Sequence, residues 1–231
     1  MSQRAVDQAQ QAGQRERAGQ WEAGAALREA LFGNALEARK KATVALQQAK
    51  DREVEYGAAL AFAFSGNCSR AEALASDLEK RFPEDTAVRF SYLPTLRARV
   101  ALDRGATRAA LHLLDAAVPY ELGAPRSSID GLFGALYPVY VRGLAYLAAR
   151  QGNQAAAEFQ KILDYRGVVV SDPVGALARL QIARAFSMAG NAVKADNAYR
   201  DFLSLWNDAD PEIPILRQAK AECAKLNRHT S

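Results

Sequence analysis

Small and large apolar residues recur along the chain at helical spacing, and a glycine interrupts them at intervals. The clearest copy of the pattern consists of Ala183, Phe186, Gly190, Ala195, Tyr199 and Phe202. Apolar positions three and four residues apart lie on one face of an α-helix. A glycine between two such stretches suits a left-handed helix cap, which side chains with a Cβ resist. The pattern therefore predicts two antiparallel helices joined at the glycine.

Four other segments share this order of small residues, turn glycine and larger apolar residues. They are Ala26, Glu29, Gly33, Ala38, Ala42 and Ala45, then Ala59, Phe62, Gly66, Ala71, Ala75 and Leu78, then Ala98, Ala101, Gly105, Ala110, Leu114 and Ala117, and finally Gly143, Tyr146, Gly152, Ala155, Phe159 and Ile162. In the final copy Gly152 is displaced from the expected turn position. Small residues on both helices let their axes approach to the short end of the usual ~8–10 Å range. Five helical hairpins are predicted.

These segments resemble the tetratricopeptide repeat family, whose unit is a helix-turn-helix of about 34 residues. The turn glycines are 33, 39, 47 and 38 residues apart, so longer connections must absorb the difference after the first interval. The resemblance implies an all-α fold: a right-handed α-solenoid of about five such hairpins with a C-terminal capping helix. We place the hairpins at residues 19–51, 52–85, 91–124, 136–170 and 176–210.

Three segments lie outside these hairpins. Residues 1–18 are rich in Gln and Arg and predict an N-terminal helix or a flexible cap. Residues 211–231 predict a capping helix and a tail, with Pro214 in the first helical turn. The apolar stripe of that helix consists of Ile215, Leu216, Ala219, Cys223 and Leu226. Residues 119–136 are rich in Gly, Pro and Ser and predict a long loop, either a tolerated surface insertion or a functional segment.

The amino-acid sequence of the later hairpins resembles a second group of proteins. The segments Tyr137–Leu147, Ala155–Leu163 and Asp201–Trp206 are similar to the C-terminal repeat region of large bacterial serine/threonine protein kinases and related winged-helix regulators. This resemblance implies a sensory or scaffolding part of a longer signalling protein. The chain has no glycine-rich loop after a strand, no His-Arg-Asp catalytic loop and no Asp-Phe-Gly. We therefore predict no enzyme activity in this chain.

Composition and charge support a helical globular chain. It contains 48 alanines but only 15 glycines and 8 prolines, and 49% of its residues are hydrophobic. The longest mostly apolar stretch, residues 54–64, is too short for a membrane span, and no secretory leader is recognisable. We expect a soluble part of a longer protein, cytoplasmic or periplasmic. The net charge of +4 is scattered along the chain, so nucleic-acid binding is not the leading prediction.

Residues that carry catalytic or metal chemistry are few. Cys68 and Cys223 lie far apart and have no histidine pair nearby, so we predict small buried thiols and no metal site. The two histidines, His112 and His229, lie on a predicted helix and in the tail, without the surroundings of a catalytic base. No phosphate-binding loop occurs. The prediction is no catalytic residue, no metal and no cofactor.

The predicted binding surface follows from the stacking of hairpins. The first helices of successive repeats line the concave side of a solenoid. The residues whose register directs them to that side include Tyr56, Phe64, Tyr92, Arg99, Tyr137, Tyr140 and Arg184. Tyrosines offer contact area at low entropic cost, and arginines pair with carboxylates. We predict a protein-interaction module that binds a peptide or protein segment in this concave groove. The alternative is that several of these tyrosines pack within the repeats.

Two other functions remain open from the sequence. Copies of the protein would self-associate weakly through an exposed end or the insert at residues 119–136, which makes the chain an assembly scaffold. Alternatively, the hairpins would bind single-stranded nucleic acid, as helical repeats can read RNA base by base.

Overall fold

Only helices and irregular connections occur in residues 2–123 and 133–230, the part of the chain that this computed structural model describes. The prediction of an all-α fold is confirmed. The helices are α1 (Ser2–Gln11), α2 (Arg15–Phe32), α3 (Ala35–Gln48), α4 (Arg52–Phe64), α5 (Cys68–Arg81), the π-helical η1 (Val88–Tyr92), α6 (Leu93–Asp103), α7 (Thr107–Asp115), the 3-10 helix η2 (Val118–Tyr120), α9 (Tyr137–Ala148), α10 (Gly152–Asp164), α11 (Arg166–Val169), α12 (Pro173–Met188), α13 (Ala192–Leu205) and α14 (Pro214–Thr230).

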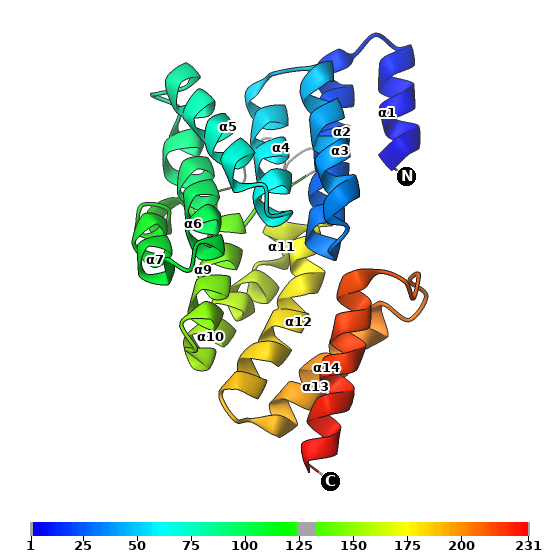
Figure 1. Cartoon of the computed structure of the whole chain (residues 1–231), viewed down its shortest axis with the longest axis vertical. Coiled ribbons are helices and arrows are strands. Elements are labelled where there is room, and N and C mark those ends of the chain that lie inside the picture. Colours follow the sequence, from blue (N-terminus) through cyan, green and yellow to red (C-terminus); the bar gives the residue numbers. More distant parts are fainter. Residues whose placement is uncertain (1, 124–132, 231) are drawn as a thin grey trace.

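The long helices pack in consecutive pairs. The pairs are α2 with α3, α4 with α5, α6 with α7, α9 with α10, and α12 with α13. Figure 1 shows the first three pairs following one another from α2 to α7, after which the chain turns back through α9 and α10 to α12–α14. We call α2, α4, α6, α9 and α12 the first helices, and α3, α5, α7, α10 and α13 the second helices.

The two sets of helices occupy different layers. Each first helix packs against the first helix of the next pair, and each second helix packs against that next first helix as well. In α4 every residue from Glu53 to Ala63 is buried, whereas α5 buries only Ala71, Ala75 and Leu78. A helix that is apolar around its whole circumference belongs in a core, and one with a single apolar stripe lies at a surface. The first helices therefore form the inner layer and the second helices the outer layer.

The turns between paired helices follow the glycine pattern at four of five places. Gly33, Gly66, Gly105 and Gly190 all have positive φ, between 74° and 95°. In the fourth pair the left-handed residue is Arg150, with φ 59°, and Gly152 is the first residue of α10. A Cβ on Gly152 would lie 2.5 Å from the carbonyl oxygen of Ala185. The expectation of a turn glycine there is wrong, because this glycine serves the close approach of α10 to α12.

The small residues of the repeated pattern lie where the helices touch. Ten of them, two in each pair, are buried: Ala26, Ala38, Ala59, Ala71, Ala98, Ala110, Gly143, Ala155, Ala183 and Ala195. A Cβ on Gly143 would lie 2.6 Å from the ring of Phe159, so this pair has no room for a larger side chain. The predicted role of these positions in close helix packing is confirmed.

The N-terminal segment differs from the prediction, whereas the C-terminal segment matches it. Residues 1–18 do not form one helix, because Gly13 has φ 70° and separates α1 from α2, which begins at Arg15. At the other end α14 begins at Pro214, as predicted, and packs against α13 and α2. Its buried residues are Ile215, Leu216, Ala219 and Cys223, with Leu226 partly buried.

The first and last parts of the array are in contact. The rings of Phe32 at the end of α2 and Trp206 after α13 meet edge to face, with centroids 5.0 Å apart. Beside them Gly33 faces Pro214, since a Cβ on this glycine would lie 3.0 Å from the proline Cβ. The succession of helical pairs therefore bends back until its two ends touch.

The predicted loop at residues 119–136 is partly helical and partly core. Its residues 124–132 lie outside the described residues. Before them η2 spans Val118–Tyr120, and after them Phe133, Ala135 and Leu136 are buried. The interpretation of the whole segment as a tolerated surface insertion is therefore wrong for its last residues, because they fill space between the first helices.

Candidate functional site

The residues predicted to line a concave groove do not form an open surface. The tyrosines among them are buried, with at most 3% of their area exposed: Tyr56, Tyr92, Tyr137 and Tyr140. The other predicted residues are partly buried: Phe64, Arg99 and Arg184. Six of them lie on inner-layer helices and Tyr92 directly precedes α6, but the side chains of that layer fill the space between its helices. The expectation that these tyrosines are exposed to a partner is therefore wrong.

Tyr56 and Tyr92 form a stacked pair in this interior. Their ring centroids are 3.6 Å apart and their planes differ by 4°. The hydroxyl of Tyr92 donates to Oε2 of Glu53 at 2.8 Å. Burial raises the pKa of Tyr92 above its usual range, and the nearby Glu53 carboxylate raises it further. The ring and the hydroxyl both make contacts inside the molecule, so the side chain holds the junction of η1 and α6 against α4.

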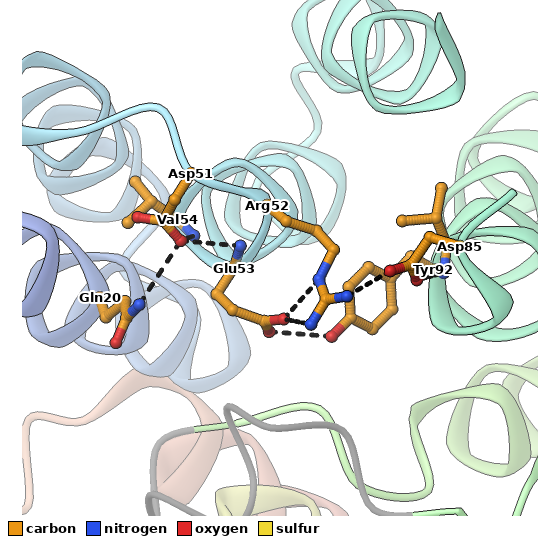
Figure 2. Close-up of polar contacts among 8 residues, drawn as sticks. Gln20, Asp51, Arg52, Glu53, Val54, Asp85 and Tyr92 are labelled. Atoms are coloured by element: carbon orange, nitrogen blue, oxygen red, sulfur yellow. Dashed lines mark hydrogen bonds and ion pairs between the residues drawn. The ribbon is translucent and has the colours of Figure 1, made fainter. Parts of the chain in front are cut away.

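A charged cluster surrounds this tyrosine at the start of α4 (Figure 2). The guanidinium of Arg52 lies between two carboxylates: its Nε is 2.8 Å from Oε1 of Glu53, and it also pairs with Asp85. Glu53 is 5% exposed. A buried carboxylate needs a charged or hydrogen-bonding partner, since isolation in the core is costly. Arg52 and Tyr92 supply those partners.

The same cluster contains the cap of α4. Asp51 accepts hydrogen bonds from the backbone amides of Glu53 at 3.0 Å and Val54 at 3.2 Å, and Nε2 of Gln20 donates to it at 3.4 Å. A cavity of about 540 Å³ opens beside these residues, with Phe82 on its lining. The charged side chain of Arg52 on that lining is already ion-paired. The cluster joins α2, α4 and the turn after α5, which is a structural role.

A second interior contact fixes the residues that precede α9. Phe133 lies against α4 at Gly57, where a Cβ would be 2.5 Å from the phenyl Cζ. The amide of Gly134 donates to Oδ2 of Asp172 at 3.2 Å, and the hydroxyl of Tyr137 donates to Oδ1 at 3.0 Å. Burial raises the pKa of Asp172 to about 7, although these hydrogen bonds oppose the rise. Asp172 thus connects α12 to α9.

The two predicted arginines also have partners within the chain. Arg99 lies over the ring of Phe64, 5.2 Å from its centroid, and pairs with Asp103 at 2.6 Å. Arg184 makes two hydrogen bonds to the carboxylate of Glu222, each of 2.9 Å. Their guanidinium groups are therefore engaged in contacts within the chain.

Open grooves lie instead on the outer layer, between neighbouring second helices. A groove of about 520 Å³ separates α3 from α5, one of about 320 Å³ lies between α5 and α7, and one of about 450 Å³ lies between α10 and α13. The second helices make little contact with one another. Side chains of the first helix beneath line each groove, among them Glu55 of α4, Arg97 of α6 and Phe186 of α12. The repeat pattern did not reveal these grooves, because it distinguishes only packed positions from solvent-facing ones.

The groove between α10 and α13 has an apolar floor and charged edges. Its floor contains Ile182 and Phe186 of α12 with Leu163 of α10. Cationic side chains on the lining are Arg166, Arg179 and Lys194, and the carboxylates are Asp164 and Asp201. This combination suits a ligand with both apolar and charged groups, which is typical of a protein segment.

The groove between α3 and α5 contains two neighbouring carboxyl groups, on Glu55 and Asp77. Burial raises the pKa of Glu55 to about 8, and the nearby Asp77 adds to the rise. One amino group of Arg81 contacts both, 2.9 Å from Glu55 Oε2 and 3.3 Å from Asp77 Oδ2, and the other donates to the carbonyl of Lys50 at 2.7 Å. The pair and its arginine tie α5 to the α3–α4 turn.

Metal-ligating side chains do not converge in the described part of the chain, where no three His, Cys, Asp or Glu residues are placed to hold an ion. Cys68 and Cys223 are free thiols. Within the same residues, no helix combines the length and apolar character that a bilayer span requires.

No protein-family model matches the chain, and no characterised protein gives a significant match to it.

Proposed function

We propose that the chain is a protein-interaction module built as a right-handed solenoid of tetratricopeptide-like hairpins. The repeated small residues and the left-handed turn glycines support this proposal, because they recur at equivalent places in successive helical pairs. The similarity of the later hairpins to the C-terminal region of bacterial serine/threonine kinases supports a place in a longer signalling protein.

One observation carries the proposal. Side chains of the inner layer pack against one another, and grooves lie between the second helices of the outer layer. The inner tyrosines are buried, whereas Arg179 and Phe186 of α12 are partly exposed in the groove between α10 and α13. Partners of helical modules dock where an apolar floor is bordered by charged side chains. We therefore assign partner binding to the outer layer rather than to the concave groove expected from the sequence.

Site-specific photo-crosslinking tests this function. A benzoylphenylalanine replaces, one at a time, the exposed groove residues Ala73, Ala116 and Asn197, and the exposed control residues Ala109 and Gln154 outside the grooves. In an extract of the cells that make the protein, we expect one protein to crosslink at a groove position and not at the controls. Equal crosslinking at all positions, or crosslinks to RNA alone, would contradict the proposal.

A second candidate, self-assembly, is favoured by one group of exposed apolar residues. Val118, Tyr120 and Leu122 are 49%, 43% and 46% exposed, and Phe90 stacks on Tyr120 with centroids 4.5 Å apart. Such residues often lie at contacts between proteins. Sedimentation of the chain with Tyr120→Ser beside the unchanged chain tests this candidate. A monomer at every concentration for both chains would exclude it.

A further inference from the structure

Two cations of the groove between α10 and α13 differ in their partners from Arg52 in the cavity beside α4. In the cavity Arg52 pairs with two carboxylates of the chain itself. In the groove Arg179 donates only to the backbone carbonyl of Gly175, at 3.2 Å, and Lys194 lies over the ring of Phe186 at 5.4 Å. Neither cation forms an ion pair within the described residues. Their charge is therefore available to a ligand.

The positions of these cations on the helices define the spacing that a ligand must match. Arg179 and Phe186 are seven residues apart on α12, which is about two helical turns or 10 Å. Because Lys194 lies beside Phe186, Arg179 and Lys194 lie near opposite ends of the apolar floor, and Arg166 of α11 adds a third cation to the lining. Ile182 lies between Arg179 and Phe186 on the same face of α12 and is 6% exposed. The order along the groove is cation, apolar floor, cation.

The carboxylates of the lining limit the kind of ligand. Asp164 accepts a hydrogen bond from Nε2 of Gln160 at 2.8 Å, and Asp201 lies on the opposite wall. A polyanion with evenly spaced charges, such as a nucleic-acid backbone, would be repelled by both. A short segment with separate acidic residues can contact the cations and avoid these carboxylates. The lining therefore favours a protein helix over nucleic acid.

From this arrangement we infer that the groove binds an acidic amphipathic helix of a partner protein. The helix carries acidic residues at positions i and i+7, facing Arg179 and Lys194, and apolar residues at i+3 and i+4, facing Ile182 and Phe186. This is the helix-in-groove mode, in which residues on one helix face act as anchors. The inference rests on the proposed interaction function and specifies its site and the chemistry of its partner.

A peptide-display selection tests the inference even while the partner is unidentified. The library has a fixed amphipathic helical frame with randomised residues at i, i+3, i+4 and i+7, and the bait is the full chain. We expect Asp or Glu to be enriched at i and i+7, with Leu, Ile, Met or Phe between them. Arg179→Glu with Lys194→Glu should weaken binding of the enriched peptides by about 10- to 100-fold, which corresponds to about 1.4–2.8 kcal/mol.

Two comparisons keep the result interpretable. The same selection on the double variant should enrich Lys or Arg at i and i+7, since reversal of the groove charge reverses the preference. Arg104→Glu is the matched control, because Arg104 is exposed, lies outside the outer grooves described above and is paired with Glu72. It should leave binding of the enriched peptides unchanged, and thermal melts should show that all variants fold.

Three outcomes would overturn the inference, and they differ in whether the proposed interaction function is still supported. Peptides that bind the chain and its double variant equally would exclude this groove but preserve the interaction function. Displacement of the enriched peptides by a 20-nucleotide oligo(U) in a salt-dependent manner would assign the cations to nucleic acid. Absence of any enrichment would overturn the inference, while crosslinking of one protein at Ala73 or Ala116 would still support the broader function.

Discussion

The inner face and the groove between α10 and α13 contain the same kinds of residue and use them differently. In the interior Tyr56 and Tyr92 are fully buried, and Arg52 is paired with carboxylates of the chain. In the groove Phe186 is partly buried and Lys194 has no ion pair among the described residues. Aromatic residues and cations indicate a binding site only where they are not already stacked on, or paired with, other groups of the same chain. The comparison thus places binding on the outer layer.

The contact between the two ends of the array explains the difference. Phe32 meets Trp206, and Phe133 occupies the space beside Gly57 that an open solenoid would leave to a ligand. The first helices pack against one another, whereas the second helices make little contact with each other, so the interior is filled and grooves remain in the outer layer. Variants that disturb one face and not the other can test this relation.

The largest effect is expected from Tyr92→Ala. This substitution removes a buried stacked ring and leaves Glu53 without its tyrosine hydrogen-bond donor. Loss of a buried aromatic side chain costs about 3–5 kcal/mol of unfolding free energy. Urea denaturation measures it, with Tyr120→Ala as the control, since Tyr120 is stacked but 43% exposed. Equal losses for the two variants would contradict the burial of the inner tyrosine.

A smaller effect, which depends on pH, is expected at Asp172. Burial raises its pKa to about 7 in the folded chain, above its ordinary value of 3.8. The folded state therefore keeps a proton that the unfolded state releases, and this contribution to stability is present below pH 4 and is lost as pH rises to about 7. Asp172→Asn should remove that slope, worth at most about 4 kcal/mol. Unfolding measured from pH 4 to 8 provides the test.

Glu55 supplies an internal reference for this pH profile. Burial also raises its pKa, to about 8, so it contributes a loss of stability in the same direction that extends to higher pH. The Asp172 variant should keep this second slope, and Glu55→Gln should remove it while retaining the first. If the unfolding free energy depended on pH in the same way in the unchanged chain, Asp172→Asn and Glu55→Gln, neither carboxyl would be buried in the folded chain.

The contact that joins the ends of the array is expected to have an intermediate effect. Trp206→Ala removes the ring contacts with Phe32 and Phe202 and should cost about 1–3 kcal/mol, because Trp206 is only partly buried. Hydrogen exchange should increase at the end of α2 and the start of α14 and remain unchanged in α6 and α7. Uniform acceleration would indicate that the ends are not held by a local contact.

Much of the fold follows from the local sequence, whereas the closure of the array does not. Gly33 and Ala26 act within one hairpin, so spacing along the chain is enough to assign a turn and a helix contact. The pairs Phe32–Trp206 and Phe133–Gly57 join residues far apart in the chain, and no local pattern relates them. Register correctly assigns Tyr56 to the inner face. It does not show that the face is filled.

The smallest effect is expected in the outer groove. Lys194→Ala removes an exposed cation that lies over Phe186, and exposed cation–π contacts contribute about 0.5–1 kcal/mol or less. Thermal melting should therefore change by a few degrees at most. A large loss of stability would mean that the groove belongs to the structural core and is not free for a partner.

Chemical nitration of the native chain tests the central claim most directly, because it reports which tyrosines the solvent reaches. With tetranitromethane, mapped by peptide mass spectrometry, Tyr120 and Tyr165 should react first, since each is 43% exposed. Tyr56, Tyr92 and Tyr137 should remain unmodified until the chain is unfolded. Nitration of these three at the rate of Tyr120 in the folded protein would show that the inner face is open and would contradict the account.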